Sequence, residues 1–242
     1  MDLFSFPTPL VKAKFLKRLN RFVSHFQLAS GELVAAHSPN TGSMKGLLVS
    51  GAPALLWDSQ NPSRKYPLSW KAVFVDGIWV GIDTAFPNQI TCDLIAARQI
   101  TSLPALSGLA REKSVGAHSR IDIFGYEGET PWFIEVKNVT LAHRGTARFP
   151  DAVTARGLKH LHELDRLMGQ GAKAAMVYVI QREDCERFQA AEEIDPAYAL
   201  QLREVHSRGV LVIPLLFSVS QNGLKFEKEI PYEPDAGGIV TQ

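Results

Sequence analysis

Three residues whose types could do chemistry together lie within one short stretch of the chain: Asp122, Glu135 and Lys137. The residues between them read as a β-hairpin, because apolar and polar residues alternate on both sides of a turn at residues 127–130. A turn centred between positions 128 and 129 sets residue 122 opposite residue 135. The two carboxylates would then share one face, with Cβ atoms about 5 Å apart. Like charges at that spacing destabilise a strand pair, so a compensating partner is expected.

One such partner is a divalent metal ion. Mg²⁺ (or Mn²⁺) takes oxygen ligands and commonly uses one or two carboxylates, which Asp122 and Glu135 would supply. Lys137 follows Glu135 by two residues and shares its face, where its ammonium could position a water or offset charge on an attacked phosphate. The competing interpretation is a salt-bridged face on which Arg120 and Lys137 neutralise both acids. The opposite face is expected to be apolar and buried: Ile121, Ile123, Trp132, Ile134 and Val136.

A polar stripe is expected on a long helix predicted over residues 151–168. Arg156, Lys159, His160 and Glu163 recur at helical spacing, so they lie on one side of it. Two interpretations stay open: the stripe faces water, or its basic residues line the same cleft as the hairpin. His160 and His162 would point about 200° apart, so they are not expected to form a metal-binding pair.

A second group of charges lies near the N-terminus. Residues 1–85 carry nine basic and five acidic side chains, and five of the basic ones fall within ten residues that contain no acid: Lys12, Lys14, Lys17, Arg18 and Arg21. Apolar residues alternate with them, as in a strand that follows a phosphate backbone. The alternative is a solvated edge strand protected by its lysines.

The elements that would hold the basic cluster are all β. Residues 1–85 are expected to form one domain with strands over 10–18, 21–28, 32–37, 54–59, 68–75 and 78–83. Asp76-Gly77 between two apolar runs is a strong hairpin signal. Short strands with Gly, Pro and Asn turns suggest a small barrel, of which an OB-like barrel is one choice.

The elements that would hold the hairpin are mixed. In a second domain, residues 86–232, we expect a helix near 90–99 capped by Asn88, strands near 109–115, 119–124 and 132–137, and then the long helix. A strand at 173–180, a helix at 196–207 ending at Gly209 and a strand at 210–217 follow. The order αβββαβαβ predicts an α/β (α+β overall) fold with a mixed sheet. The tail 233–242 is expected to fray.

Composition and motifs exclude several classes of protein. No apolar run is long enough for a membrane span, and no signal peptide is recognisable, so a cytoplasmic protein is expected. Two distant cysteines indicate neither a disulfide framework nor a zinc site. The segment 40–46 could offer backbone amides to a phosphate or form a tight turn. It lacks the Gly-Lys-Ser/Thr of a P-loop, so binding of a nucleotide triphosphate is not expected.

An acid-bearing helix, a hairpin carrying Asp and Glu-x-Lys, and a following helix resemble the pattern of PD-(D/E)xK nucleases. Longer blocks make the resemblance specific to the sugar fermentation stimulation protein A (SfsA) family: residues 40–44, 61–62, 64–65, 119–122, 135–141 and 149–154. The resemblance implies an N-terminal OB-like domain, a C-terminal nuclease-like domain, DNA binding and a link to regulation of sugar catabolism.

The resemblance also implies roles for particular residues. Asp122, Glu135 and Lys137 match the nuclease motif, and its helical acid falls at Asp93, where relatives are expected to carry Glu. Residues expected to contact DNA are the N-terminal basic cluster together with Arg64, Lys65, Arg156 and Lys159. Two functions stay open: a metal-dependent nuclease acting on DNA with low sequence specificity, or a DNA-binding regulator on a non-catalytic nuclease fold. A homodimer is compatible with both.

Overall fold

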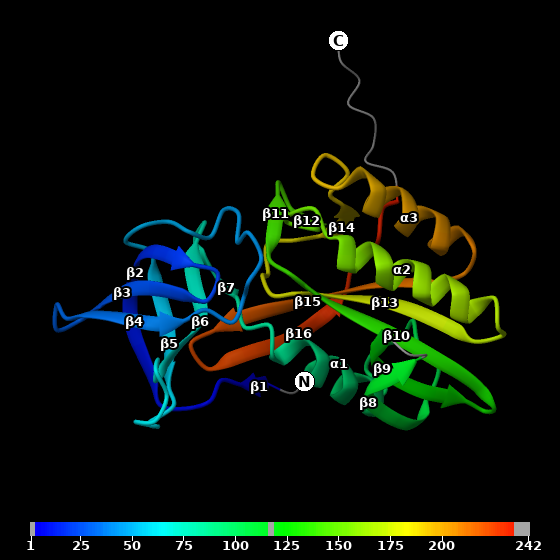
Figure 1. The fold of residues 1–242 in the computed structure, drawn as a ribbon, viewed down its shortest axis with the longest axis horizontal. Coiled ribbons are helices and arrows are strands. Elements are labelled where there is room, and N and C mark those ends of the chain that lie inside the picture. The colour runs from blue at the N-terminus through cyan, green and yellow to red at the C-terminus, as the bar shows by residue number, and fades with distance from the viewer. Residues whose placement is uncertain (1–2, 116–118, 235–242) are drawn as a thin grey trace, which may run out of the picture.

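The structure is a computed structural model, and it describes residues 3–115 and 119–234 of the 242-residue chain. Two β-rich units pack side by side, a barrel formed by the first third of the chain and a layered α/β unit formed by the rest (Figure 1). Leu55 and Ala72 of the barrel belong to the same buried cluster as Ile90 and Leu94 of the first helix. The two units therefore share a hydrophobic core.

The barrel confirms the expected OB-like domain. Its strands are β2 (Leu10–Asn20), β3 (Val23–Leu28), β4 (Leu33–His37), β5 (Pro53–Asp58), β6 (Leu68–Val75) and β7 (Ile78–Gly81). They follow the order β4-β3-β2-β5-β6-β7, and a β4–β6 pairing at His37 and Ser69 closes the first five into a barrel. Trp70 stacks on Phe15 at its centre. Asp76 and Gly77 both have positive φ, 54° and 82°, as a two-residue hairpin turn requires.

The second unit is built on a seven-stranded mixed sheet. Its strands lie in the order β1 (Leu3–Ser5), β16 (Gly223–Glu229), β15 (Leu211–Ser220), β13 (Lys173–Ile180), β10 (Thr130–Val139), β9 (Ser119–Glu127) and β8 (Ser107–Val115). The β10–β13 and β13–β15 pairs are parallel. A small sheet of β11 (Leu141–His143), β12 (Thr146–Phe149) and β14 (Arg187–Ala190) extends one end. This arrangement confirms the predicted mixed sheet.

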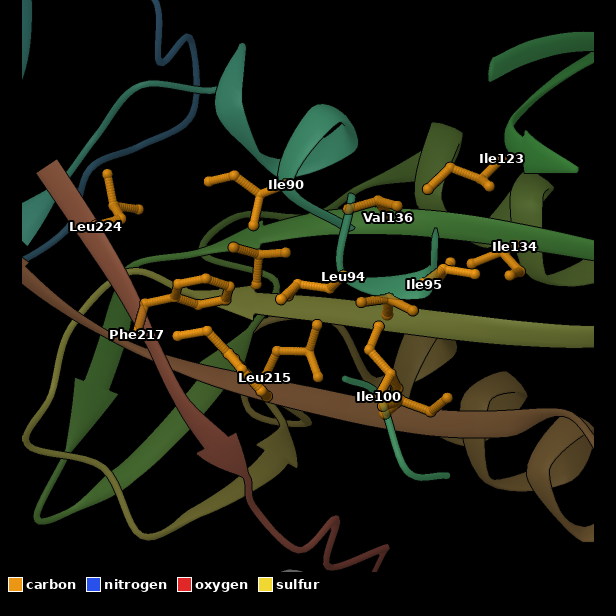
Figure 2. Packing of buried hydrophobic residues seen from close by; sticks show 14 of the residues in the cluster. Ile90, Leu94, Ile95, Ile100, Ile123, Ile134, Val136, Leu215, Phe217 and Leu224 are labelled. Carbon is orange, nitrogen blue, oxygen red and sulfur yellow. The ribbon is translucent and has the colours of Figure 1, made fainter. Parts of the chain in front are cut away.

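Helices cover both faces of the large sheet. Helix α1 (Phe86–Ala96) packs on one face, where Ile90, Leu94 and Ile95 meet Ile134 and Leu215 (Figure 2). Helices α2 (Ala155–Met168) and α3 (Pro196–Ser207) cover the other face (Figure 1). Successive residues of a strand point to opposite faces, so Glu135 and Lys137 of β10 face the α2 side while Ile134 and Val136 face α1.

Several details differ from the sequence expectations. Strand β1 pairs with β16 although residues 1–85 were expected to form one separate domain. Helix α1 begins at Phe86, and its N-cap Ala85 makes no side-chain cap bond, so Asn88 lies inside the first turn. Ile121 packs in the α2 cluster whereas Ile123 packs under α1, so the side-chain alternation of β9 is interrupted at Asp122.

The end of the chain was expected to fray from residue 233. Residues 235–242 lie outside the described part. Within it, the Glu233 amide donates to the Phe188 carbonyl at 2.9 Å, and its carboxylate accepts from Gln189 at 3.0 Å. Residue 233 is therefore attached to β14.

No helix in the described part of the chain combines the length and the apolar character that crossing a membrane would require.

Candidate functional site

The hairpin brings the two predicted carboxylates to neighbouring positions. The β9–β10 register runs from Glu127 opposite Thr130 to Ile123 opposite Ile134. It ends one residue before Asp122 and Glu135. There the Asp122 carboxylate turns onto the β10 backbone, and its Oδ2 accepts a hydrogen bond from the Val136 amide at 2.9 Å. The interrupted alternation of β9 is what allows this contact.

Glu135 is the more deeply buried of the two acids, with 1% of its surface exposed. Its Oε1 accepts a hydrogen bond from Lys137 Nζ at 2.7 Å and contacts His160 Nδ1 of α2. Lys137 Nζ lies 3.1 Å from the same His160 nitrogen. Glu135 Oε2 is also buried but has no hydrogen-bond partner among the described residues. Both donors therefore meet on one carboxylate oxygen, and the other oxygen is left unsatisfied.

The two carboxylates respond to this environment in opposite ways. Burial raises the pKa of Asp122, and the nearby negative charge of Glu135 raises it further, despite hydrogen bonds from Val136 and Asn88. Burial would also raise the pKa of Glu135, but hydrogen bonds and charge from His160 and Lys137 outweigh it and lower the pKa. Glu135 is thus held as a carboxylate, whereas Asp122 carries a charge that its neighbours compensate incompletely.

Helix α2 supplies His160, which lies at the site and was predicted only as part of a stripe. Thr154 caps the helix by accepting from the Gly157 amide at 3.0 Å, which fixes where its turns begin. Arg156, one turn before His160, donates from Nε to His160 Nε2 at 3.4 Å. Of the two open interpretations of the stripe, the cleft applies to Arg156, which lines the cavity, whereas His160 lies against the buried Glu135. Lys159 is exposed beside Glu163.

A cavity of about 360 Å³ lies between the two units, next to this cluster. Lys137 and Asn88 line this cavity, whereas the two acids do not. Lys137 contacts Glu135, and Asn88 contacts Asp122. The barrel contributes the loop at residues 40–42, and the second unit contributes residues 136–141, Arg148, Phe149, Asp151 and Arg156. The acids therefore sit one side chain below the cavity surface.

The loop that forms the barrel side of the cavity is held at both ends. Asn40 Oδ1 accepts from the Gly42 amide at 2.9 Å, which is the tight turn that the sequence left open. Asp151 accepts from Ser43 Oγ at 2.9 Å and from the Met44 amide at 3.0 Å. A Cβ atom at Gly42 would stand 3.0 Å from the carboxylate of Asp151 and from Asn40 Oδ1, so any side chain there would crowd both groups.

The structure gives the predicted basic cluster more than one role. Arg18 donates to the carbonyls of Asn20, Arg21, Asn40 and Gly42, so its guanidinium anchors the loop and is not free to follow a phosphate backbone. Lys12 and Lys14 line a separate shallow depression on the barrel. Lys17 and Arg21 are exposed near the β2–β3 turn.

Arg64 and Lys65 are exposed on the barrel and lie over aromatic rings. The Arg64 guanidinium is 5.6 Å from the Trp57 ring centre, and Lys65 Nζ is 5.5 Å from that of Tyr66. Neither residue lines the cavity beside Lys137. The predicted DNA-contacting residues therefore do not all line this cavity, which among them is lined by Arg156.

Asp93 does not reach the carboxylate pair, contrary to its predicted role. It is exposed on α1 and accepts from Gln89 Nε2 at 2.7 Å. The residue of α1 that meets Asp122 is Asn88, whose Nδ2 donates to Oδ1 at 2.8 Å. Five residues separate the two positions, which rotates their side chains about 140° apart on a helix. Arg120, expected to neutralise the acids, instead pairs with Glu112 at 3.0 Å.

These features define a class of protein: an OB-type barrel packed on a mixed α/β sheet, with a cluster of acid, lysine and histidine beside the cavity between them. Residues 16–82 match the model of the SfsA N-terminal OB domain, and residues 85–223 match the Sugar fermentation stimulation protein RE domain. The chain belongs to the sugar fermentation stimulation protein (SfsA) family.

Similar proteins match over nearly the whole chain. A sugar fermentation stimulation protein homolog of Gloeobacter violaceus is 41% identical over 226 residues, 93% of this chain and 95% of the relative. Its counterpart in Geotalea daltonii is 39% identical over 223 residues, 92% and 96% of the two chains. The solved structure of Pyrococcus furiosus SfsA in complex with Ca²⁺ superposes with a TM-score of 0.86 at 25% identity, and the match covers 96% of this chain and 99% of that one.

Proposed function

We propose that this protein binds DNA with low sequence specificity and cleaves its phosphodiester bonds with the help of Mg²⁺ or Mn²⁺ held by Asp122 and Glu135. The observation that carries the proposal is Glu135, a buried carboxylate with one unsatisfied oxygen, placed beside a second acid below a cavity that an OB-type barrel helps to form. OB domains commonly bind nucleic-acid strands, which supports DNA as the partner.

The two carboxylates fit a divalent cation. In the described part of the chain no group of three or more His, Cys, Asp and Glu side chains is arranged as a metal site, so the donors are two carboxylates. Mg²⁺ often binds through one or two carboxylates and completes its shell with waters. A cation here would satisfy Glu135 Oε2, and its charge would oppose the burial and the repulsion by Glu135 that together raise the pKa of Asp122. The Pyrococcus furiosus relative is in complex with Ca²⁺, which supports the proposal that this chain too binds a divalent cation.

A bound cation would supply charge stabilisation to a phosphate oxygen and lower the pKa of a coordinated water. The chain's own residues supply orientation. Asn88 and the Val136 amide fix the two Asp122 oxygens, and His160 fixes Glu135. Lys137 lines the cavity, where its ammonium would face an incoming phosphate and offset charge on it. Positioning and electrostatic stabilisation are what catalysis of phosphate transfer mainly needs.

A second function is a DNA-binding regulator, linked to sugar catabolism, that retains this fold without cleaving. Three observations favour it. Lys137 and His160 already compensate the Glu135 charge, and neither acid lines the cavity. Asp93, the expected third acid, lies elsewhere on α1. In this alternative the cluster is an ion-pair network that attaches α2 to β10 within the second unit.

The deciding experiment is a cleavage assay on purified protein with Mg²⁺, Mn²⁺ or chelator. Glu135→Gln keeps the size of the side chain and removes the charge. Glu163→Gln is the matched control, because Glu163 pairs with Arg166 at 2.7 Å on the surface of the same helix that carries His160. Metal-dependent cleavage that Glu135→Gln abolishes and Glu163→Gln retains supports the nuclease. DNA binding without cleavage in any metal supports the regulator.

A further inference from the structure

A second depression continues the cavity along the barrel. Both hollows are lined by Thr41, Gly42, Phe149, Asp151 and Arg156. The second one reaches Arg21 at the β2–β3 turn. A continuous groove therefore leads from Lys137, past Arg156, to Arg21 on the outside of the barrel. Asp151 is its acidic member, and that carboxylate is occupied by Ser43 Oγ and the Met44 amide.

The turn that supplies Arg21 to the outer end of this groove also carries an exposed aromatic residue. Phe22 directly follows Arg21, and 55% of its surface is exposed. Its backbone is fixed, because its amide donates to Asn20 Oδ1 at 2.9 Å and its carbonyl accepts from the Ser38 amide at 2.7 Å. A single exposed apolar residue is ordinary on a protein surface. Phe22 differs from such a residue because it directly follows, in the sequence, an arginine that lines the groove. Proteins bind unpaired nucleotides with an aromatic ring and a cation together.

The inner end of the groove is small. A volume of about 360 Å³ lies near the lower limit of small-molecule pockets, roughly 300–1,000 Å³, so it suits one nucleotide unit and not a duplex. Arg18 and Asp151 hold the barrel loop from two sides, so a wider opening would break their hydrogen bonds. A phosphate must enter this space to meet Lys137.

We infer that the nucleic acid bound in this groove is a single strand, which stacks a base on Phe22 and passes Arg21 and Arg156 on its way to Lys137. The inference rests on the proposed function, because it takes the partner to be nucleic acid. It adds that the form of nucleic acid that enters the groove is a single strand. Stacking on an aromatic ring tolerates any base, so this route agrees with low sequence specificity.

The test measures binding in chelator, where cleavage plays no part. A fluorescently labelled single-stranded oligonucleotide and its blunt duplex are titrated against wild type, Phe22→Leu, Phe22→Trp and Leu33→Ala. Phe22→Leu keeps an apolar side chain but removes the ring, and Phe22→Trp keeps a ring. Leu33, 69% exposed on β4, is the control for loss of exposed apolar surface on the barrel. Melting temperatures confirm that every variant is folded.

We expect wild type to prefer the single strand, and Phe22→Leu to weaken that binding roughly 5- to 150-fold, the range that loss of one stacked base gives. Phe22→Trp and Leu33→Ala should bind as wild type does. Tighter binding of the duplex, or a single strand bound equally well by Phe22→Leu, overturns the inference and leaves the nuclease proposal standing. Phe22-dependent binding of the single strand without cleavage in Mg²⁺ or Mn²⁺ supports the inference and overturns the nuclease proposal. Binding of neither probe overturns both.

Discussion

Among the residues that the structure describes, two lysine–carboxylate pairs are buried, and they differ in how completely their atoms are satisfied. Lys71 of the barrel pairs with Asp83, and Lys137 of the mixed sheet pairs with Glu135. The side chains are similarly enclosed, 9% and 2% exposed in the first pair and 13% and 1% in the second. Burial and residue type therefore cannot tell the two apart.

The difference lies in the remaining contacts. Asp83 uses one oxygen for Lys71 and the other for the Ala85 amide at 3.0 Å, and Lys71 lies over the rings of Trp57 and Phe86 at 5.1 and 5.5 Å. This pair is closed on all sides. Glu135 leaves Oε2 unsatisfied, a second acid lies beside it, and Lys137 borders the cavity. A closed pair holds the fold together, whereas an open one has unused capacity for a ligand.

The largest expected effect would break the closed pair. Lys71→Ala leaves Asp83 buried without its cation, which commonly costs about 3–5 kcal/mol of stability. Denaturant unfolding measures this loss. Lys71→Met combined with Asp83→Asn removes both charges and keeps an oxygen for the Ala85 amide, so most of the loss should be recovered. Equal stability of Lys71→Ala and wild type would show that the pair does not hold the fold.

Lys137→Ala tests the open pair in the same way and should act on rate instead of stability. If the nuclease proposal holds, cleavage falls about 10²- to 10³-fold, or roughly 3–4 kcal/mol, as for loss of a group that stabilises charge in the transition state. His160 still contacts Glu135, so the melting temperature and the affinity for DNA should change little. If Lys137→Ala unfolds as readily as Lys71→Ala, Lys137 stabilises the fold as Lys71 does and does not act on the rate.

Much of the frame around these pairs could be predicted from the sequence. The turn at residues 127–130 and the pairing of β9 with β10 are local, so the closeness of Asp122 and Glu135 was predictable, although the interruption of the β9 alternation at Asp122 was not. The Asp76-Gly77 hairpin is local in the same sense. The long α2 was predictable from its apolar spacing, although it begins four residues later than expected, at Ala155.

The residues that contact the two acids were not predictable from the sequence, because they come from helices whose packing on the sheet depends on contacts between distant parts of the chain. His160 reaches Glu135 only because α2 lies over β10, and its i, i+4 spacing from Arg156 was the available signal. Helix α1 begins at Phe86 instead of near residue 90, and it turns Asn88, not Asp93, toward Asp122. Strand β1 has only three residues and pairs with residues more than two hundred positions away.

Metal titration sharpens the comparison further. Mg²⁺ or Mn²⁺ at about 100 times its dissociation constant should stabilise wild type by about 2.7 kcal/mol through mass action. Asp122→Asn should remove this gain. The double variant Lys71→Met with Asp83→Asn should keep it, because the closed pair that it replaces does not bind a cation in wild type. Melting curves with metal and with chelator make the measurement. Identical curves for wild type would mean that the open pair binds no cation.

The smallest expected effect is the pH dependence of stability without metal, and it follows from the opposite pKa shifts of the two acids. Asp122 has a pKa above its ordinary 3.8 in the folded protein, so the folded state takes up this proton before the unfolded chain does. As the pH falls from neutral through that raised pKa, Asp122 therefore stops destabilising the fold. Glu135 has a pKa below its ordinary 4.5 in the folded protein. Its stabilising contribution is therefore complete above pH 4.5 and is lost as the pH falls through the lowered pKa.

Wild type in chelator should consequently gain stability relative to Asp122→Asn as the pH falls from neutral into the mildly acidic range. Relative to Glu135→Gln, wild type should lose stability only below a pH of about 4.5, the value of the ordinary pKa of a glutamate side chain. The Lys71–Asp83 pair is present in all three proteins, so its own titration cancels in the differences. Saturating Mg²⁺ should reverse the Asp122 trend, since a bound cation favours the charged carboxylate. Parallel curves for wild type and Asp122→Asn in chelator would show that neither burial nor the charge of Glu135 raises the pKa of Asp122, and the open pair would then be as self-contained as the closed one.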